Sequence, residues 1–240
     1  MEETKTKEKR FIAVAVAVLA VALLVVSIPI SKTIKSKKSF YTQINGRLTY
    51  ATDVADFDMY VYEVGAMVRY GRYDWLVLAI RDSSALLITK DCVSDGEYHY
   101  YKKGGGAPVT WEQSMLRKWL NKDFYNSFNE IEKKNIQSTA VQNEGSPNYG
   151  TSGGNATVDK IFLLSLAEAQ IYFNSDSERV ATSAGNQGWL PGDDYYWWLR
   201  SPGNKQASAV CVDNKGHINS EGLLAGGNIL GVRPAMWITL

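Results

Sequence analysis

Hydrophobic residues are distributed very unevenly along this 240-residue chain, and the longest apolar run lies near the N-terminus. Residues 11–30 read FIAVAVAVLAVALLVVSIPI and contain no charged side chain. A helix of about 20 residues spans about 30 Å, the thickness of the hydrocarbon layer of a bilayer. A segment that is apolar on all sides is also unlike the amphipathic helices of water-soluble surfaces. The pattern therefore predicts a transmembrane helix over residues 11–30, preceded by a short cytoplasmic tail over residues 1–10.

A cleaved signal peptide is the alternative interpretation of this segment. Signal peptides have a shorter apolar region, roughly 7–15 residues, followed by a small-residue cleavage site. Here Pro29-Ile30-Ser31-Lys32 follows instead. The segment is flanked by four Lys or Arg residues on each side, so the positive-inside rule does not choose an orientation. Because a single N-terminal span with a short head usually acts as a signal anchor, we expect a single-pass protein of the cell membrane with an extracytoplasmic C-terminal domain.

After this run, the pattern changes to short apolar stretches separated by polar residues. Residues 31–59 are predicted to form a stalk and lead-in segment, and residues 60–240 one domain. The apolar runs 75–80 and 85–89 flank Asp82-Ser83-Ser84, residues that favour turns, which predicts a β-hairpin. A second hairpin is expected where the strand 209–212 turns through residues 213–216.

The middle of the domain has a helical pattern. Four segments pair a serine or threonine with a glutamate or glutamine three residues later, the capping box that opens a helix. They are Thr110–Gln113, Ser127–Glu130, Ser165–Glu168 and Ser175–Glu178. After the first, an apolar stripe at helical spacing is assigned to the core: Trp111, Met115, Leu116, Trp119 and Leu120.

Two C-terminal segments, 197–203 and 231–238, each place an arginine inside an aromatic, apolar strand that proline ends or interrupts. An arginine is costly to bury unless it is paired or hydrogen-bonded. We therefore assign Arg200 and Arg233 to structural pairing with loop carbonyls or with Asp159, in preference to a clamp for an anionic ligand. The residues of this structural signature are Trp198, Arg200, Pro202, Arg233, Pro234 and Trp237.

The order of these motifs resembles a known family. The set comprises GRYDWLVL, TWEQSMLRKWLNKDFYNSF, NYGTSGGN, DKIFLLSLAEAQIYF, WWLRSPGN, a V-D-x-x-G hairpin and GVRPAMWI. It is similar to domain-of-unknown-function family 6273, common in clostridial and related Gram-positive bacteria. The resemblance covers about residues 60–240.

The C-terminal strands also look like those of C-type-lectin-like folds, including the formylglycine-generating-enzyme branch. This resemblance implies an α+β domain with small twisted antiparallel sheets, two to three helices and long loops. The catalytic chemistry of that branch is not carried over, because its paired C-terminal cysteines are missing. Calcium-dependent sugar binding is not carried over either, because the Glu-Pro-Asn, Gln-Pro-Asp and Trp-Asn-Asp motifs are absent.

Charge and cysteine content restrict the possible partners. Residues 39–240 hold 18 Lys or Arg and 22 Asp or Glu. Such an acidic balance is unlike the basic footprint of nucleic-acid-binding domains, so no nucleic-acid partner is expected. Cys92 and Cys211 are the only cysteines, and the sequence leaves open whether they pair or stay reduced in the core. No metal-ligand spacing or cofactor motif is found, so no metal and no cofactor are expected.

Three loops are expected to present ligand contacts: residues 143–158, 182–194 and 219–230. Aromatic side chains in polar loops stack on sugars or fill protein interfaces, and loop carboxylates and amides hydrogen-bond ligands. We find no catalytic constellation and expect a non-catalytic binding domain for a cell-surface glycan, peptide or protein. The alternatives are a cell-envelope-modifying enzyme that uses loop carboxylates, and a purely structural surface subunit. The candidate ligand contacts are Trp189, Asp193, Asp194, Tyr196, Asn204 and Asn228.

Overall fold

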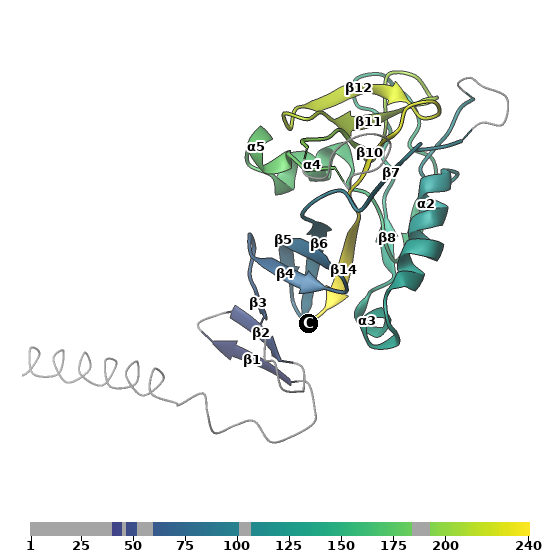
Figure 1. The fold of residues 1–240 in the computed structure, drawn as a ribbon. Helices are drawn as coiled ribbons and strands as arrows, with labels where there is room; N and C mark the ends of the chain where they lie inside the picture. The colour runs from purple at the N-terminus through teal and green to yellow at the C-terminus, as the bar shows by residue number, and fades with distance from the viewer. Residues whose placement is uncertain (1–39, 45–46, 52–59, 101–106, 184–192) are drawn as a thin grey trace, which may run out of the picture. The chain divides into compact units, whose positions relative to one another are not determined.

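The computed structural model describes residues 40–44, 47–51, 60–100, 107–183 and 193–240 (Figure 1). This part of the chain is an α+β structure of small, mostly antiparallel sheets, as the sequence predicts, and it has four α-helices where two to three were expected. The predicted tail 1–10 and the predicted transmembrane helix 11–30 lie outside the described residues. Within the described residues, no helix is long and apolar enough to cross a membrane.

A three-stranded antiparallel sheet comes first along the chain. Its strands are β1 (Phe40–Ile44), β2 (Arg47–Ala51) and β3 (Tyr60–Tyr62), paired in that order. The first two strands lie within the predicted stalk 31–59, so that segment contains a β-hairpin.

A four-stranded antiparallel sheet has the order β14-β6-β5-β4. It consists of β4 (Met67–Tyr70), β5 (Tyr73–Arg81), β6 (Ser84–Thr89) and β14 (Ala235–Thr239). The hairpin β5–β6 confirms the predicted one. Asp82 takes a positive φ of 51° in its turn, a conformation that aspartate tolerates better than most residues.

A five-stranded sheet has the order β12-β11-β10-β13-β7. Its strands are β7 (Ser94–Gly96), β10 (Trp197–Pro202), β11 (Ser208–Val212), β12 (Ile218–Leu224) and β13 (Leu230–Val232). The pair β10–β13 is parallel and the other pairs are antiparallel. The hairpin β11–β12 confirms the second predicted hairpin, although β12 extends through much of the predicted loop 219–230.

The predicted final strand is in fact two strands that belong to different sheets. The chain leaves β13 in the five-stranded sheet, passes Arg233 and Pro234, and continues as β14 in the four-stranded sheet. Proline has no N–H to donate to a ladder, but its carbonyl oxygen accepts a hydrogen bond of 3.0 Å from the main chain of Thr89. This segment therefore connects the two larger sheets.

The helices are short and their caps differ in part from the prediction. α2 (Met115–Trp119) is capped by Ser114, not Thr110, and α3 (Glu130–Asn135) is capped by Asn129, not Ser127. The capping box of Ser165 and Glu168 at α4 (Leu166–Tyr172) is confirmed. Ser175 precedes α5 (Asp176–Arg179), as predicted, without a side-chain cap bond. A π-helical turn, η2 (Leu120–Phe124), and a 3-10 turn, η3 (Tyr125–Ser127), continue α2 toward α3.

The loop 143–158, predicted to present ligand contacts, is bound to its surroundings by hydrogen bonds. It follows β8 (Thr139–Val141), and its last two residues belong to β9 (Thr157–Asp159), which pairs with β8 in a two-stranded sheet. Thr151 Oγ1 donates to the carbonyl of Gly203 at 2.7 Å, and the side chain of Gln206 bonds both main-chain groups of Ser152. The loop therefore packs against the turn between β10 and β11.

Aromatic residues form much of the core between the sheets and helices. Phe128 packs against Trp75 of β5 with ring centroids 6.4 Å apart, and Tyr98 packs against Trp198 at 5.8 Å. The two cysteines are free and buried, which settles the open choice in favour of unpaired core residues. Burial raises the pKa of each thiol to about 12.

Candidate ligand-binding groove

The structure distributes the predicted ligand contacts over separate places. Trp189 lies outside the described residues. Asp193 and Asp194 are exposed, and Tyr196 is half-buried. Asn204 donates its main-chain N–H to the carbonyl of Glu221, and Asn228 donates its side-chain amide to Leu224. Asn204 and Asn228 are thus each hydrogen-bonded to a main-chain carbonyl of β12.

Arg200 lies within β10 and is 5% exposed. Its guanidinium forms an ion pair with Glu168 of α4, including an Nη2–Oε1 contact of 3.0 Å, and donates to the carbonyls of Leu163 and Gln142. Asp159, the other partner considered for it, instead bonds Arg117 and Trp111. Arg200 thus connects a central strand to α4 and to the chain after β8.

Arg233 is 2% exposed, and no described carboxylate forms an ion pair with it. Its Nε donates to the carbonyl of Thr89 at 2.8 Å, and its guanidinium lies 5.3 Å from the ring centroid of Phe173. Burial lowers the pKa of Arg233 to about 10, and nearby Cys92 and Asp91 act in the opposite direction. At neutral pH the group remains charged, and main-chain carbonyls and aromatic faces offset its lost hydration.

The other signature residues are also packed into the scaffold. The indole N–H of Trp198 donates to the carbonyl of Gly96 at 2.9 Å, and Pro202 pairs with Ala209 in the β10–β11 ladder. Trp237 is half-buried beneath the guanidinium of Arg81. Of the two signature arginines, neither Arg200 nor Arg233 is exposed as an anion clamp.

An open groove with a volume of about 310 Å³ lies between β7 and α2. We call it the β7–α2 groove. Two of its aromatic or thioether side chains are well exposed, Tyr100 at 56% and Met115 at 47%. Its volume is at the small end of the range of small-ligand sites, about 300–1,000 Å³. The groove is lined by residues 94–97, Tyr100, Met115, Leu116, Trp119 and Val232.

Contacts away from the groove hold α2 in place. Ser114 accepts the main-chain N–H of Arg117 and so sets the start of α2. Arg117 then pairs with Asp159 at 2.7 Å, and the fully buried carboxylate of Asp159 also accepts the indole N–H of Trp111. This face of α2 is therefore tied to β9, and the helix exposes Met115 on its outer surface.

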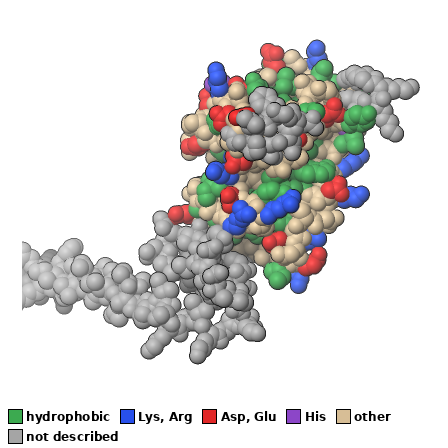
Figure 2. Space-filling model, in the orientation of Figure 1, with side chains coloured by type: hydrophobic (Ala, Val, Ile, Leu, Met, Phe, Trp, Pro, Cys, Tyr) green, Lys and Arg blue, Asp and Glu red, His purple; other side chains and the backbone are tan. Residues whose placement is uncertain are grey.

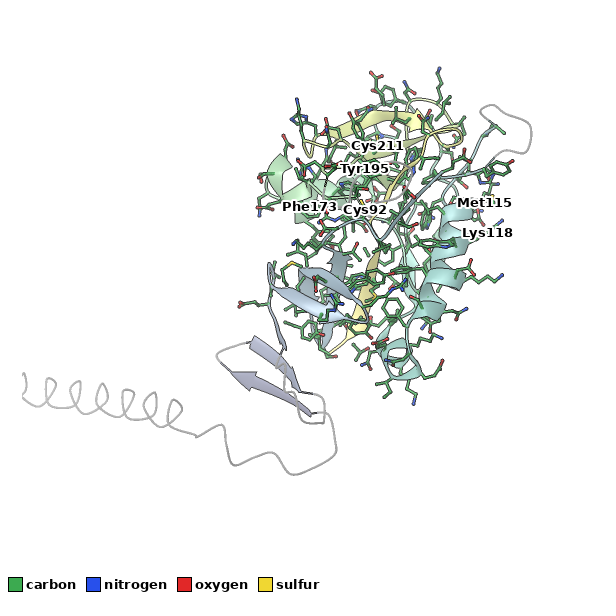
Figure 3. The ribbon with its side chains drawn as sticks, viewed as in Figure 1. Cys92, Met115, Lys118, Phe173, Tyr195 and Cys211 are labelled. Atoms are coloured by element: carbon green, nitrogen blue, oxygen red, sulfur yellow. The ribbon has the colours of Figure 1, made fainter. Side chains whose placement is uncertain are left out.

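The strand side is fixed by the five-stranded sheet. β7 pairs with β13, Ser94 opposite Val232 and Gly96 opposite Leu230. Beyond β7, the carbonyl of Tyr98 accepts the main-chain N–H of Leu116 at 3.3 Å, a bond that joins the two walls. Figure 3 shows Met115 and Lys118 on α2, while Cys92 and Cys211 lie around the five-stranded sheet.

Both charged residues that line the groove are acidic. Glu97 Oε1 accepts the main-chain N–H of Gly227 at 2.8 Å, which orients its carboxylate. Asp95 Oδ2 is buried and has no hydrogen-bond partner among the described residues. Buried polar atoms usually have partners, so Asp95 keeps an unused hydrogen-bond acceptor beside the groove. Next to the groove, burial and the charge of Lys118 lower the pKa of His99, while Glu97 acts against them.

The groove combines aromatic and thioether surface with carboxylates, and this composition suits binding. The described residues contain no group of three His, Cys, Asp or Glu side chains placed to hold a metal ion. His217 contacts Asp213 and Asp176, and Ser201 accepts a hydrogen bond from the main chain of Leu166. The charges on the face seen in Figure 2 are of mixed sign.

Sequence reasoning missed the groove residues. Met115 and Trp119 were assigned to the core stripe, but Met115 is exposed and Trp119 is half-buried. The sequence did contain a signal, because the apolar stripe is wider than the buried face of the helix. Trp111, Leu116 and Leu120 form that buried face. Apolar residues beyond the buried face of a helix indicate a contact surface.

Comparison with known proteins gives one match. Residues 82–240 match the family described as domain of unknown function (DUF6273), and this region includes the whole β7–α2 groove. No curated protein and no solved structure matches the chain.

Proposed function

We propose that this chain, which belongs to the DUF6273 family, is a non-catalytic binding protein of the bacterial cell surface. In this proposal residues 11–30 anchor it in the membrane, and a C-type-lectin-like domain outside the cytoplasm binds a glycan, peptide or protein. The observation that carries the proposal is the β7–α2 groove. A shallow groove with exposed aromatic and thioether side chains favours binding, whereas a deep pocket with clustered carboxylates would favour catalysis.

The arrangement of the groove supports this role in a second way. Its walls are held by contacts of the scaffold, Asp159 behind α2 and the β13 ladder behind β7. A preformed site loses less freedom on binding than a mobile one, so more of the contact energy appears as affinity. Tyr100 and Trp119 supply the aromatic surface that often dominates binding energies.

The test uses the full-length protein in detergent micelles on an array of glycans, cell-wall fragments and peptides. We expect binding to a restricted ligand class, and we expect Tyr100→Ala to weaken it by on the order of tenfold or more. Tyr149→Ala is the matched control, because Tyr149 is also an exposed tyrosine, 41% accessible, but lies in the loop 143–158. Loss of binding in Tyr149→Ala with full binding in Tyr100→Ala would move the site to that loop.

A further inference from the structure

We propose that the β7–α2 groove binds an extended peptide segment through a lysine or arginine side chain. This inference rests on the proposed binding function and specifies its ligand. Three features of the groove support it: the negative charge of its two carboxylates, the apolar side chains beside these carboxylates, and the edge of the sheet at β7.

The charges of the groove complement a cation. Asp95 and Glu97 are the two charged residues in the lining, and both carry carboxylates. Glu97 is already oriented by Gly227, and Asp95 Oδ2 is buried without a described partner. An ammonium or guanidinium group supplies the donors that such oxygens accept, and charge-assisted hydrogen bonds are about twice as strong as neutral ones. Lys118 lies on α2 but does not line the groove.

The apolar walls suit the rest of such a side chain. Lysine and arginine have long aliphatic stems that pack on apolar surface while the charged head reaches polar groups. Met115, Leu116 and Trp119 provide that surface beside the carboxylates. The aromatic faces of Trp119 and Tyr100 also attract cations that lie over them. A negatively charged or wholly apolar ligand would leave the charges of Asp95 and Glu97 without a cation.

The sheet edge favours an extended peptide as the carrier of the cation. β7 is the last strand of its sheet, so within the described residues no strand pairs with its outer edge. All of residues 94–97 line the groove, together with Val232 of β13, so the groove runs along β7. A peptide that follows the groove therefore lies beside the outer edge of β7, where a peptide can add as a further strand.

The test measures binding of three peptides to full-length protein in detergent micelles by isothermal titration calorimetry. The probe is acetyl-Ala-Lys-Ala-Lys-Ala-amide. One control peptide replaces lysine with norleucine, which keeps the stem and removes the charge, and the other replaces it with glutamate. The protein variants are Asp95→Asn with Glu97→Gln, and Glu221→Gln, which removes an exposed acid of β12 outside the groove.

We expect the lysine peptide to bind at least about tenfold more tightly than both controls, the size expected for one hydrogen bond to a charged group. The double variant should lose most of this preference with an unchanged melting temperature, and Glu221→Gln should keep it. Equal affinities for the three peptides, or a preference that survives in the double variant, would overturn the inference. If the lysine peptide does not bind but a glycan of the array binds and depends on Tyr100, the inference fails while the proposed function stands. If neither binds, both fail.

Discussion

Arg233 and Trp197 share one hydrogen-bond acceptor. Arg233 Nη1 and the indole N–H of Trp197 donate to the same carbonyl, that of Arg179, at 3.2 and 3.0 Å. The guanidinium also lies 5.1 Å from the ring centroid of Trp197. The two arginine-containing segments of the C-terminus therefore meet at one point of the core. This contact joins β10 to the segment that connects the two larger sheets.

The first prediction concerns this contact. Arg233→Ala removes a buried cation, the side-chain donor to the carbonyl of Thr89 and one of the two donors to the carbonyl of Arg179, and it creates a cavity beside Phe173. We expect a loss of several kcal/mol, about 3–5, from the free energy of unfolding. Arg69→Ala is the control, because Arg69 is exposed and its ion pair with Asp74 is worth at most about 1 kcal/mol. Equal denaturation midpoints for the two variants would show that Arg233 does not support the core.

Buried thiols lead to the second prediction. With a pKa of about 12, each cysteine has about one thiolate in ten thousand molecules at pH 8. We expect iodoacetamide to leave Cys92 and Cys211 unmodified in the native protein and to modify both in guanidinium chloride, as read by mass spectrometry. Rapid modification of the native protein, or a disulfide between the two, would contradict the structure.

Acid sensitivity at the β11–β12 turn gives the third prediction. Burial acts to raise the pKa of Asp213, but hydrogen bonds from the main chain of Lys215 and from His217 outweigh it, and the net pKa is lowered. A depressed carboxyl pKa contributes stability above the unfolded value of about 3.9, and this stability disappears as the pH falls through the folded pKa.

Because the site is close to solvent, we expect this contribution to be below about 1 kcal/mol. The melting temperature of Asp213→Asn should therefore lie slightly below that of the wild type at pH 7, and the two should converge as the pH falls below about 4. A difference that is constant or grows on acidification would show that Asp213 does not act through its charge.

The fourth prediction concerns residues 1–31. If residues 11–30 form a membrane anchor, deleting residues 1–31 should give a soluble, folded protein, because the described residues supply a large buried core. The full-length chain should then be found in the membrane fraction. Analytical ultracentrifugation and circular dichroism of the truncated chain are the measurements. Aggregation would indicate that the apolar segment packs against the domain.

Local patterns predicted the hairpins and one helix cap. Asp82-Ser83-Ser84 and residues 213–216 turn where expected, because turn chemistry acts over a few neighbouring residues. The caps at α2 and α3 were predicted at the wrong residues, because in each case a second residue that can cap a helix lies a few positions away. Ser127 Oγ donates to the carbonyl of Phe124 in the preceding turn, which leaves Asn129 as the cap of α3.

The groove was beyond the reach of local patterns. Gly96 and Leu230 become neighbours only through the β7–β13 pairing, although 134 positions separate them. Likewise, Tyr98 and Leu116 are joined by a hydrogen bond between two different kinds of element. Without knowledge of these pairings, the sequence does not show that Met115 and Trp119 lie beside β7. The split of the final segment into β13 and β14 was missed for the same reason.

The central claim is that ligand binds in the β7–α2 groove, and site-specific photo-crosslinking tests it most directly. A benzophenone amino acid is placed in full-length protein at Met115 or, as control, at Ile131, an exposed residue of α3 outside the groove. We then irradiate each protein with the ligand found on the array and measure the adduct by mass spectrometry. The account predicts an adduct at position 115 and none at position 131. Equal adducts at both positions, or an adduct at 131 alone, would contradict it.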